Sequence, residues 1–165
     1  MKNLIGIDVG GTKCAVVVAR GTDDGTPPQI LSKKSFPTIA GKPRETIDTL
    51  VKLSLETLAE LGLKSYDISA IGVSCGGPLD SRRGIIQSPP NLPGWDNIPI
   101  TAELSARFAI PAFLQNDANA CAMAEWKYGA GRGCENMVFC TFGTGMGAEM
   151  MQPMAVVVIG GLTYA

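Results

Sequence analysis

Residues 3–20, NLIGIDVGGTKCAVVVAR, decide the fold that the sequence predicts. Residues 3–9 are mostly apolar and typical of a buried strand, and the β-branched cluster in residues 14–20 predicts a second strand. Only the short stretch GGTK separates the two runs. A turn this short joins neighbouring antiparallel strands, so we expect the chain to open with a β-hairpin.

The pattern that follows extends this hairpin into a sheet. Residues 29–36 alternate and carry lysines, which is typical of an edge strand. Apolar residues recur at helical spacing from Pro43 to Leu61, with Pro43 suited to the first turn and Gly62 to the C-terminal cap. The remaining elements are expected as a strand at 68–74, a helix from about 101, a strand at 112–116 and a helix from 117. We therefore predict an α/β fold whose mixed sheet joins a three-strand antiparallel meander to parallel strands, with helices on both faces.

The composition excludes several classes of function. The net charge is -1, so no basic surplus would track a nucleic-acid backbone. Histidine is absent, which removes Ser-His and Cys-His nucleophile pairs and His-ligated metals. The 5 cysteines form no Cys-x-x-Cys pair, so we expect neither a disulfide framework nor a zinc site, and a reducing cytoplasm fits. We also expect no leader peptide and no membrane partner, because the longest apolar run, residues 154–161, is too short to cross a bilayer.

The glycine turn has two interpretations. In the first, Gly10 and Gly11 let the backbone approach a phosphate, Thr12 offers a hydroxyl, and Asp8 holds a magnesium ion through water. In the second, the stretch is only a hairpin turn. The Walker A motif is not present, and a dinucleotide fingerprint needs a helix where residues 14–19 are strand-like.

Asn116 and Asp117 lie where a strand is expected to end and a helix to begin, which is where open α/β sheets place ligands. Asp117 either accepts the proton of a substrate hydroxyl during phosphoryl transfer or simply caps the helix. In the long loop at residues 75–99, Gly77 and the Asn91 amide either meet a polyhydroxylated ligand or belong to a loop that covers the core.

Residues 137–148, MVFCTFGTGMGA, repeat the opening pattern of an apolar strand followed by glycines. We interpret this repeat as the start of a second, related lobe. The boundary is expected in the glycine-rich stretch near residues 130–136. The prediction is therefore a first lobe at residues 1–133 and the start of a second lobe, with an atypical tail, at residues 134–165.

Five stretches in this order resemble the ROK family of sugar kinases and related repressors: GIDVGGTK, GVSCGGPLD, PPNLPGW, QNDANACAMAEW and TFGTGMGA. The resemblance implies an actin-like, ribonuclease H-like ATPase fold in which two lobes close on ATP and a hexose. It implies a first phosphate loop of Gly10, Gly11, Thr12 and Lys13 and a second of Gly143, Thr144, Gly145 and Gly147. It also implies magnesium near Asp8, Asp117 as catalytic base, and sugar binding by Gly77, Asn91, Asn116 and Asp117.

The activity that the resemblance implies is ATP-dependent phosphorylation of a hexose or N-acetylhexosamine in the cytoplasm. Its ligands would be the sugar, ATP and magnesium, with no nucleic acid, and a homo-oligomer is left open. One alternative is a sugar-sensing transcriptional regulator, which is disfavoured because no DNA-binding module precedes the first glycine turn. Another alternative is a non-catalytic fragment that pairs with another chain.

The resemblance is expected to end at Ala148. Residues 149–153 are expected to replace the second strand of the loop hairpin, and residues 155–159 could form a substitute strand that packs on the first lobe. The Glu-x-x-Gly-His stretch, zinc ligands and adenosine pocket of the family's second lobe are missing, which suggests a premature stop, a shifted frame or a trimmed gene model. We therefore expect little or no kinase activity from this chain by itself.

Overall fold

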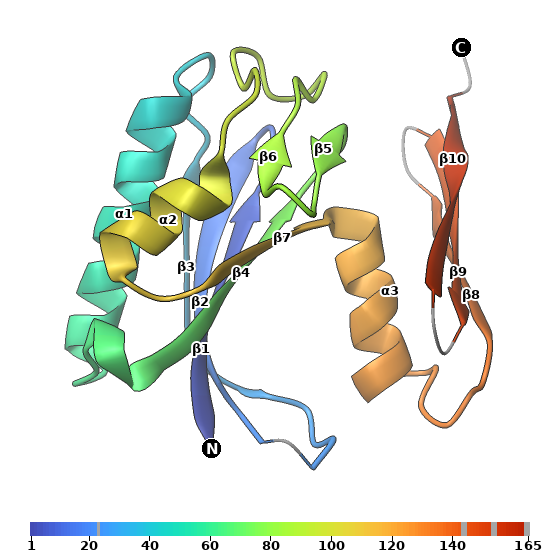
Figure 1. The fold of residues 1–165 in the computed structure, drawn as a ribbon, viewed down its shortest axis with the longest axis horizontal. Helices are drawn as coiled ribbons and strands as arrows, with labels where there is room; N and C mark the ends of the chain where they lie inside the picture. Colours follow the sequence, from blue (N-terminus) through green and yellow to red (C-terminus); the bar gives the residue numbers. More distant parts are fainter. Residues whose placement is uncertain (23, 143–144, 153–154, 164–165) are drawn as a thin grey trace. The chain divides into compact units, whose positions relative to one another are not determined.

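The computed structural model describes residues 1–22, 24–142, 145–152 and 155–163. The chain divides into two compact units, Met1–Asn116 and Asp117–Ala165. Each unit contains a sheet of its own (Figure 1). The division falls directly before the last helix, and a hinge within residues 130–136 stays a prediction.

The sheet of the first unit is five-stranded and mixed. Its strands are β1 (Lys2–Val9), β2 (Lys13–Gly21), β3 (Gln29–Pro37), β4 (Ile68–Cys75) and β7 (Ala112–Asn116). Their order in the sheet is β3-β2-β1-β4-β7. The strands β1, β2 and β3 form an antiparallel meander, whereas β4 runs parallel to β1 and β7 runs parallel to β4. The mixed sheet predicted from the sequence is confirmed.

Two helices connect the strands of this unit: α1 (Pro43–Glu60) precedes β4, and α2 (Ile100–Phe108) precedes β7. The connections also contain the 3-10 turn η1 (Ser65–Asp67) and the short strands β5 (Leu79–Asp80) and β6 (Ile85–Ile86). The predicted limits of α1 are confirmed at both ends. Pro43 opens the helix, and Gly62 (φ 67°) follows it in the left-handed region, where the Leu63 amide donates to the Leu58 carbonyl at 2.9 Å.

Both helices cover the same face of the sheet (Figure 1). They lie side by side, because Arg107 Nη1 on α2 is 2.5 Å from Asp48 Oδ1 on α1. Alternate residues of β1, Ile5, Ile7 and Val9, are buried and belong to the same hydrophobic core as the inner faces of both helices. A helix on the opposite face of this sheet stays a prediction.

The second unit contains α3 (Asp117–Tyr128) and a three-stranded antiparallel sheet of β8 (Met137–Phe142), β9 (Gly145–Gln152) and β10 (Ala155–Thr163). One expectation about the tail was wrong. Glu149 and the residues after it do not replace the second strand of the hairpin, because they lie within β9 and pair with β8. Residues 155–159 do form a strand, which pairs with β9, and packing of this strand on the first lobe stays a prediction. The apolar, β-branched sequence of this segment favours a strand. Its backbone N–H and C=O groups then need partners, which the neighbouring strand β9 supplies.

None of the helices within the described ranges is both long and apolar enough to cross a membrane.

Candidate functional site

Three parallel strands of the first unit end side by side. Val9 of β1 is the register partner of Cys75 in β4, and Cys75 is the register partner of Asn116 in β7. The segments that follow β1 and β4 therefore leave from the same edge of the sheet as Asn116. The segment after β1 carries the glycine turn, and the segment after β4 carries Gly77. The fold therefore brings together three motifs that are separate in the sequence.

The glycine turn between β1 and β2 is tightly closed. The Gly10 amide donates to the Lys13 carbonyl at 3.2 Å, and a Cβ on Gly10 would stand 2.7 Å from that oxygen. In the described part of the chain, the Gly11 and Thr12 amides donate no hydrogen bond. A short turn with two such amides is suited to an anion such as a phosphate oxygen.

Asp8 lies on β1 two residues before the turn, and its side chain is exposed. It is the register partner of Ala15 on β2 and of Ser74 on β4. An exposed carboxylate beside amides that are suited to a phosphate is itself suited to magnesium, which keeps several waters and takes few protein ligands. No cluster of three or more His, Cys, Asp or Glu side chains suited to a metal ion occurs in the described residues.

Cys14 lies beneath the turn and is completely buried. Burial raises the pKa of its thiol above the ordinary value of 9.0; hydrogen bonds with the Thr38 hydroxyl and with the Gly10 carbonyl partly offset this rise, and the negative charge of Asp8 adds to it. The thiol is therefore neutral at physiological pH. It serves as a small packing group under the turn and has no nucleophilic role there.

Asn91 is carried by a compact loop at residues 88–96. The Ser88 amide donates to the Trp95 carbonyl at 2.9 Å, and the Leu92 amide donates to the Pro89 carbonyl at 2.9 Å. The side chains of Leu92 and Trp95 are buried and anchor the loop, whereas Asn91 is exposed. The alternative of a loop that covers the core thus describes the packing of this segment, with Trp95 as a buried anchor, and the exposed Asn91 stays available to a ligand.

This loop touches the glycine turn. A Cβ built on Gly11 would stand 2.4 Å from the Asn91 carbonyl oxygen and 3.0 Å from the Asn91 Cβ. On the other side of the site, a Cβ on Gly77 would lie 3.6 Å from Asn116 Nδ2. The first unit therefore brings Asn91 to the turn and Gly77 to Asn116.

Asp117 is the first residue of α3 and directly follows Asn116 in the chain. Its side chain is exposed, and its Oδ1 accepts a hydrogen bond from the Ala118 amide at 2.8 Å. A carboxylate held at the first turn of a helix by a backbone amide fits the capping alternative. The second carboxylate oxygen keeps its capacity to accept a proton, so the two roles are compatible.

The second glycine stretch is described only in part. Gly143 and Thr144 lie outside the described residues. Gly145 and Gly147 belong to β9, where Gly147 is the register partner of Thr141 on β8 and Gly145 is the register partner of Thr163 on β10.

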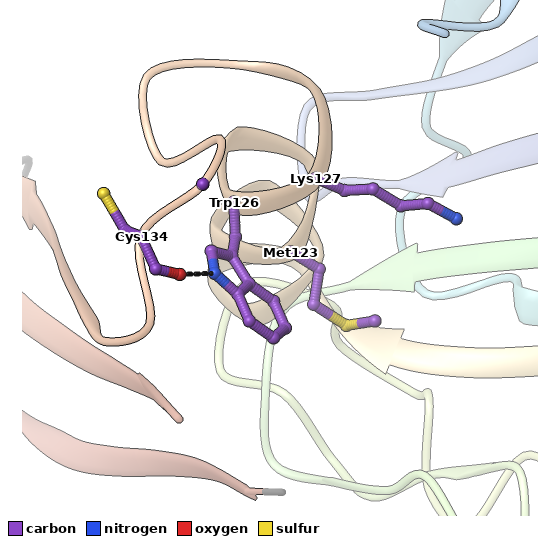
Figure 2. Close-up of a pocket in the computed structure, with 5 residues that line it drawn as sticks. Met123, Trp126, Lys127 and Cys134 are labelled. Atoms are coloured by element: carbon purple, nitrogen blue, oxygen red, sulfur yellow. Dashed lines mark hydrogen bonds between the residues drawn. The ribbon is translucent and has the colours of Figure 1, made fainter. Parts of the chain in front are cut away.

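The second unit contains a pocket that the sequence did not predict. It has a volume of about 360 Å³ and is lined by Met123, Trp126 and Lys127 of α3 and by Gly133 and Cys134. Figure 2 shows the Trp126 indole, whose Nε1 donates to the Cys134 carbonyl at 2.9 Å, with Met123 beside it. The apolar residues of α3 were the available signal, but their spacing does not distinguish a pocket wall from an ordinary packing face.

Comparison with known proteins gives the family. The family model described as "ROK family" matches residues 4–161, which extends beyond Ala148, where the resemblance was expected to end. The glucokinase of Thermotoga maritima is 36% identical over 148 residues, a match that covers 90% of this chain and 44% of that protein.

Two solved structures have the same fold. The ROK hexokinase from Thermus thermophilus gives a TM-score of 0.77 with 35% identity, covering 94% of this chain and 48% of that one. A ROK family glucokinase from Streptomyces griseus, in complex with glucose and AMPPNP, gives a TM-score of 0.74 with 28% identity, covering 96% of this chain and 47% of that one. The chain spans about half the length of these relatives. The actin-like fold class expected from the motifs is confirmed, and since the family model covers nearly the whole sequence, the chain belongs to the ROK family.

Proposed function

We propose that this chain carries the sugar-binding and first phosphate-binding residues of an ATP-dependent hexose kinase. The observation that carries the proposal is the meeting of the glycine turn and the Asn91 loop, where Gly11 and Asn91 are in contact. A kinase has to hold a phosphoryl donor and a hydroxyl acceptor next to each other, and this contact brings the two groups of candidate residues together. The glucose and AMPPNP bound by the Streptomyces griseus relative support the same pair of ligands.

In this proposal, the amides of Gly11 and Thr12 bind phosphate oxygens of ATP, with Gly10 and Lys13 closing the turn. Gly143, Thr144, Gly145 and Gly147 form the second phosphate loop. The amides place positive partial charge on the transferring phosphoryl group without any reorganisation at the moment of reaction.

Gly77, Asn91 and Asn116 bind hydroxyl groups of the sugar. Asp117 follows Asn116 and accepts the proton of the attacking hydroxyl, whose oxygen forms a bond to the γ-phosphorus of ATP while the bond from that phosphorus to the β-phosphate oxygen breaks and ADP leaves. The Ala118 amide donates to Asp117 Oδ1 at 2.8 Å and so fixes the orientation of the carboxylate. The proton is accepted by the other oxygen, Oδ2. Phosphoryl transfer needs no covalent intermediate, which agrees with a chain without histidine.

Asp8 is the residue that would hold magnesium, through water. Its exposed carboxylate stands two positions before the turn on β1, so it would hold an ion close to phosphates bound at the turn. When bound, magnesium neutralises charge on the phosphates.

The proposal is tested by binding and by turnover, measured on the same protein. Calorimetry with AMPPNP and magnesium, and separately with glucose, tests the two binding sites. We expect both ligands to bind. Failure of both to bind to a chain that is folded by circular dichroism would overturn the proposal.

Turnover is measured by phosphorylation of glucose from ATP, comparing the unsubstituted chain with Asp117→Asn. We expect Asp117→Asn to lower the rate by about 100-fold or more, as the loss of a general base does, while leaving AMPPNP affinity unchanged. The control is Asp67→Asn, because Asp67 precedes β4 at the opposite edge of the sheet and its carboxylate accepts the Lys64 amide at 2.8 Å. Equal and measurable rates in the unsubstituted chain and in Asp117→Asn would remove Asp117 from the mechanism, whereas no turnover in either would agree with the expectation that this chain by itself has little or no kinase activity.

A further inference from the structure

Thr38 makes hydrogen bonds to two residues of the glycine turn, Gly10 and Thr12. It directly follows β3 and begins the segment that leads to α1. Its amide donates to the Thr12 carbonyl at 3.0 Å, and its hydroxyl donates to the Gly10 carbonyl at 2.5 Å. One residue outside the hairpin thus binds two carbonyls of a turn of four residues.

The bond to Gly10 fixes the direction of the next amide. The peptide bond is planar and trans, so the Gly10 carbonyl and the Gly11 N–H point in opposite directions. With the Gly10 oxygen held by Thr38, the Gly11 N–H is directed away from Thr38. The same argument applies to the Thr12 carbonyl and the Lys13 N–H. Thr38 therefore aligns the Gly11 N–H, one of the two proposed phosphate donors, before any ligand binds, and it keeps the Gly10 and Thr12 carbonyl oxygens away from a phosphate that they would repel.

The buried thiol of Cys14 completes this arrangement. Cys14 Sγ is 3.3 Å from Thr38 Oγ1. Cys14 Sγ also donates to the Gly10 carbonyl at 3.9 Å. The Gly10 carbonyl therefore contacts both the Thr38 hydroxyl and the buried thiol, and the Thr38 hydroxyl is packed against that thiol.

The segment that begins with Thr38 also reaches the Asn91 loop. A Cβ on Gly94 would stand 3.2 Å from the Gly41 carbonyl oxygen, and Gly94 has a φ of 80°, so only glycine is well suited there. Residues 38–41 are thus in contact with the glycine turn through Thr38 and with the loop of Asn91 through Gly41. Neither residue belongs to a motif that carries the family resemblance.

We propose that Thr38 is a positioning residue that orients the Gly11 amide of the glycine turn for a phosphate group and turns the Gly10 and Thr12 carbonyls away from it. The proposal rests on the proposed function, because it assumes that the turn binds the phosphates of a nucleotide. Thr38 touches neither ligand in this proposal, and it acts through the Gly10 and Thr12 carbonyls alone.

The test compares Thr38→Val, which removes the hydroxyl at nearly constant volume, with Thr38→Ser, which keeps it. Thr49→Val is the matched control, because Thr49 is also half-buried and its hydroxyl donates at 2.8 Å to the Glu45 carbonyl within α1. Two quantities are measured on the full chain: hydrogen exchange without nucleotide at the Gly10 amide, which is bonded to the Lys13 carbonyl across the turn, and the dissociation constant of AMPPNP with magnesium.

We expect Thr38→Val to speed exchange in the turn and to raise the dissociation constant by about fivefold, the effect of one hydrogen bond. Thr38→Ser and Thr49→Val should leave both quantities close to those of the unsubstituted chain. If AMPPNP affinity falls in Thr38→Val but not in Thr38→Ser, the effect belongs to the hydroxyl group and not to the packing of the side chain.

Unchanged exchange in Thr38→Val would overturn the positioning role while leaving the proposed function intact. Faster exchange with unchanged AMPPNP affinity would also overturn it, since the turn would then be held for reasons unrelated to phosphate. If the unsubstituted chain binds no AMPPNP, both the positioning role and the proposed phosphate site are overturned, and the glucose titration shows whether the sugar site survives.

Discussion

Gly11 and Asn91 lie against each other so closely that residue 11 has no room for a side chain. A Cβ at that position would stand 2.4 Å from the Asn91 carbonyl oxygen, well below van der Waals contact. The backbone of one candidate ligand loop therefore rests on the backbone of the other. The absence of a side chain at residue 11 is therefore a requirement of the tertiary structure, whatever the ligand of the turn.

Gly11→Ala should displace the Asn91 loop. The added methyl group meets backbone atoms, which cannot rotate away as a side chain could, so we expect a loss of about 1–3 kcal/mol in the free energy of unfolding. Urea unfolding measures this loss, and faster amide exchange at residues 88–95 identifies the loop that moves. The control is Gly72→Ala, because nothing lies within 4 Å of a Cβ at Gly72, and it should change stability by less than about 0.5 kcal/mol. Equal effects of the two substitutions would contradict the predicted contact.

Trp95 should be the main anchor of the Asn91 loop. Its side chain is 0% exposed, and among the described residues its Nε1 has no hydrogen-bond partner. Trp95→Ala removes a large buried side chain and should cost about 3–5 kcal/mol. Trp95→Phe keeps an aromatic ring and removes an unsatisfied donor, so its cost should be much smaller. Urea unfolding of both variants checks this order, and a Trp95→Phe variant as unstable as Trp95→Ala would show that the indole nitrogen is bonded in solution.

The cysteines should divide into two groups by reactivity. Cys14 and Cys75 are buried, whereas Cys121, Cys134 and Cys140 are exposed. Because alkylation requires an accessible thiolate, iodoacetamide at pH 8 should modify only the exposed group in the native protein and all the cysteines in urea. Mass spectrometry of tryptic peptides measures the modification at each position. Rapid labelling of Cys14 in the native protein would show that the glycine turn opens.

Cys14 should also give the folded state a specific dependence on pH. The raised pKa of this thiol, caused chiefly by burial, means that the unfolded chain releases the proton at lower pH than the folded chain does. The stabilising contribution is therefore fully present below the ordinary value of 9.0, and it is lost as pH rises from there toward the folded pKa. Urea unfolding between pH 7 and pH 10 should show a smaller decline for Cys14→Ala than for the unsubstituted chain. Parallel declines would mean that the thiol is not held in its neutral form.

The sequence by itself determined the local elements and their order. Alternating apolar residues and the short GGTK turn predicted the opening hairpin, and Pro43 and Gly62 marked the ends of α1. These predictions hold because they depend on neighbours within a few residues: a proline cannot donate in the first turn, and glycine enters the left-handed region without strain. The joint set of motifs also identified the family, since several short patterns in one order are far more specific than any one of them.

Only the tertiary structure decided which loops meet. The contact of Gly11 with Asn91 and the hydrogen bonds of Thr38 join segments that are far apart in the sequence, and neither side of these contacts carries a local signal of its partner. The tail shows the same limit: its β-rich composition indicated a strand at residues 155–159, but the choice of β9 as partner depended on which backbone edge lies within reach. Propensity and periodicity report the conformation of a segment, whereas pairing and packing depend on distances that only the folded chain defines.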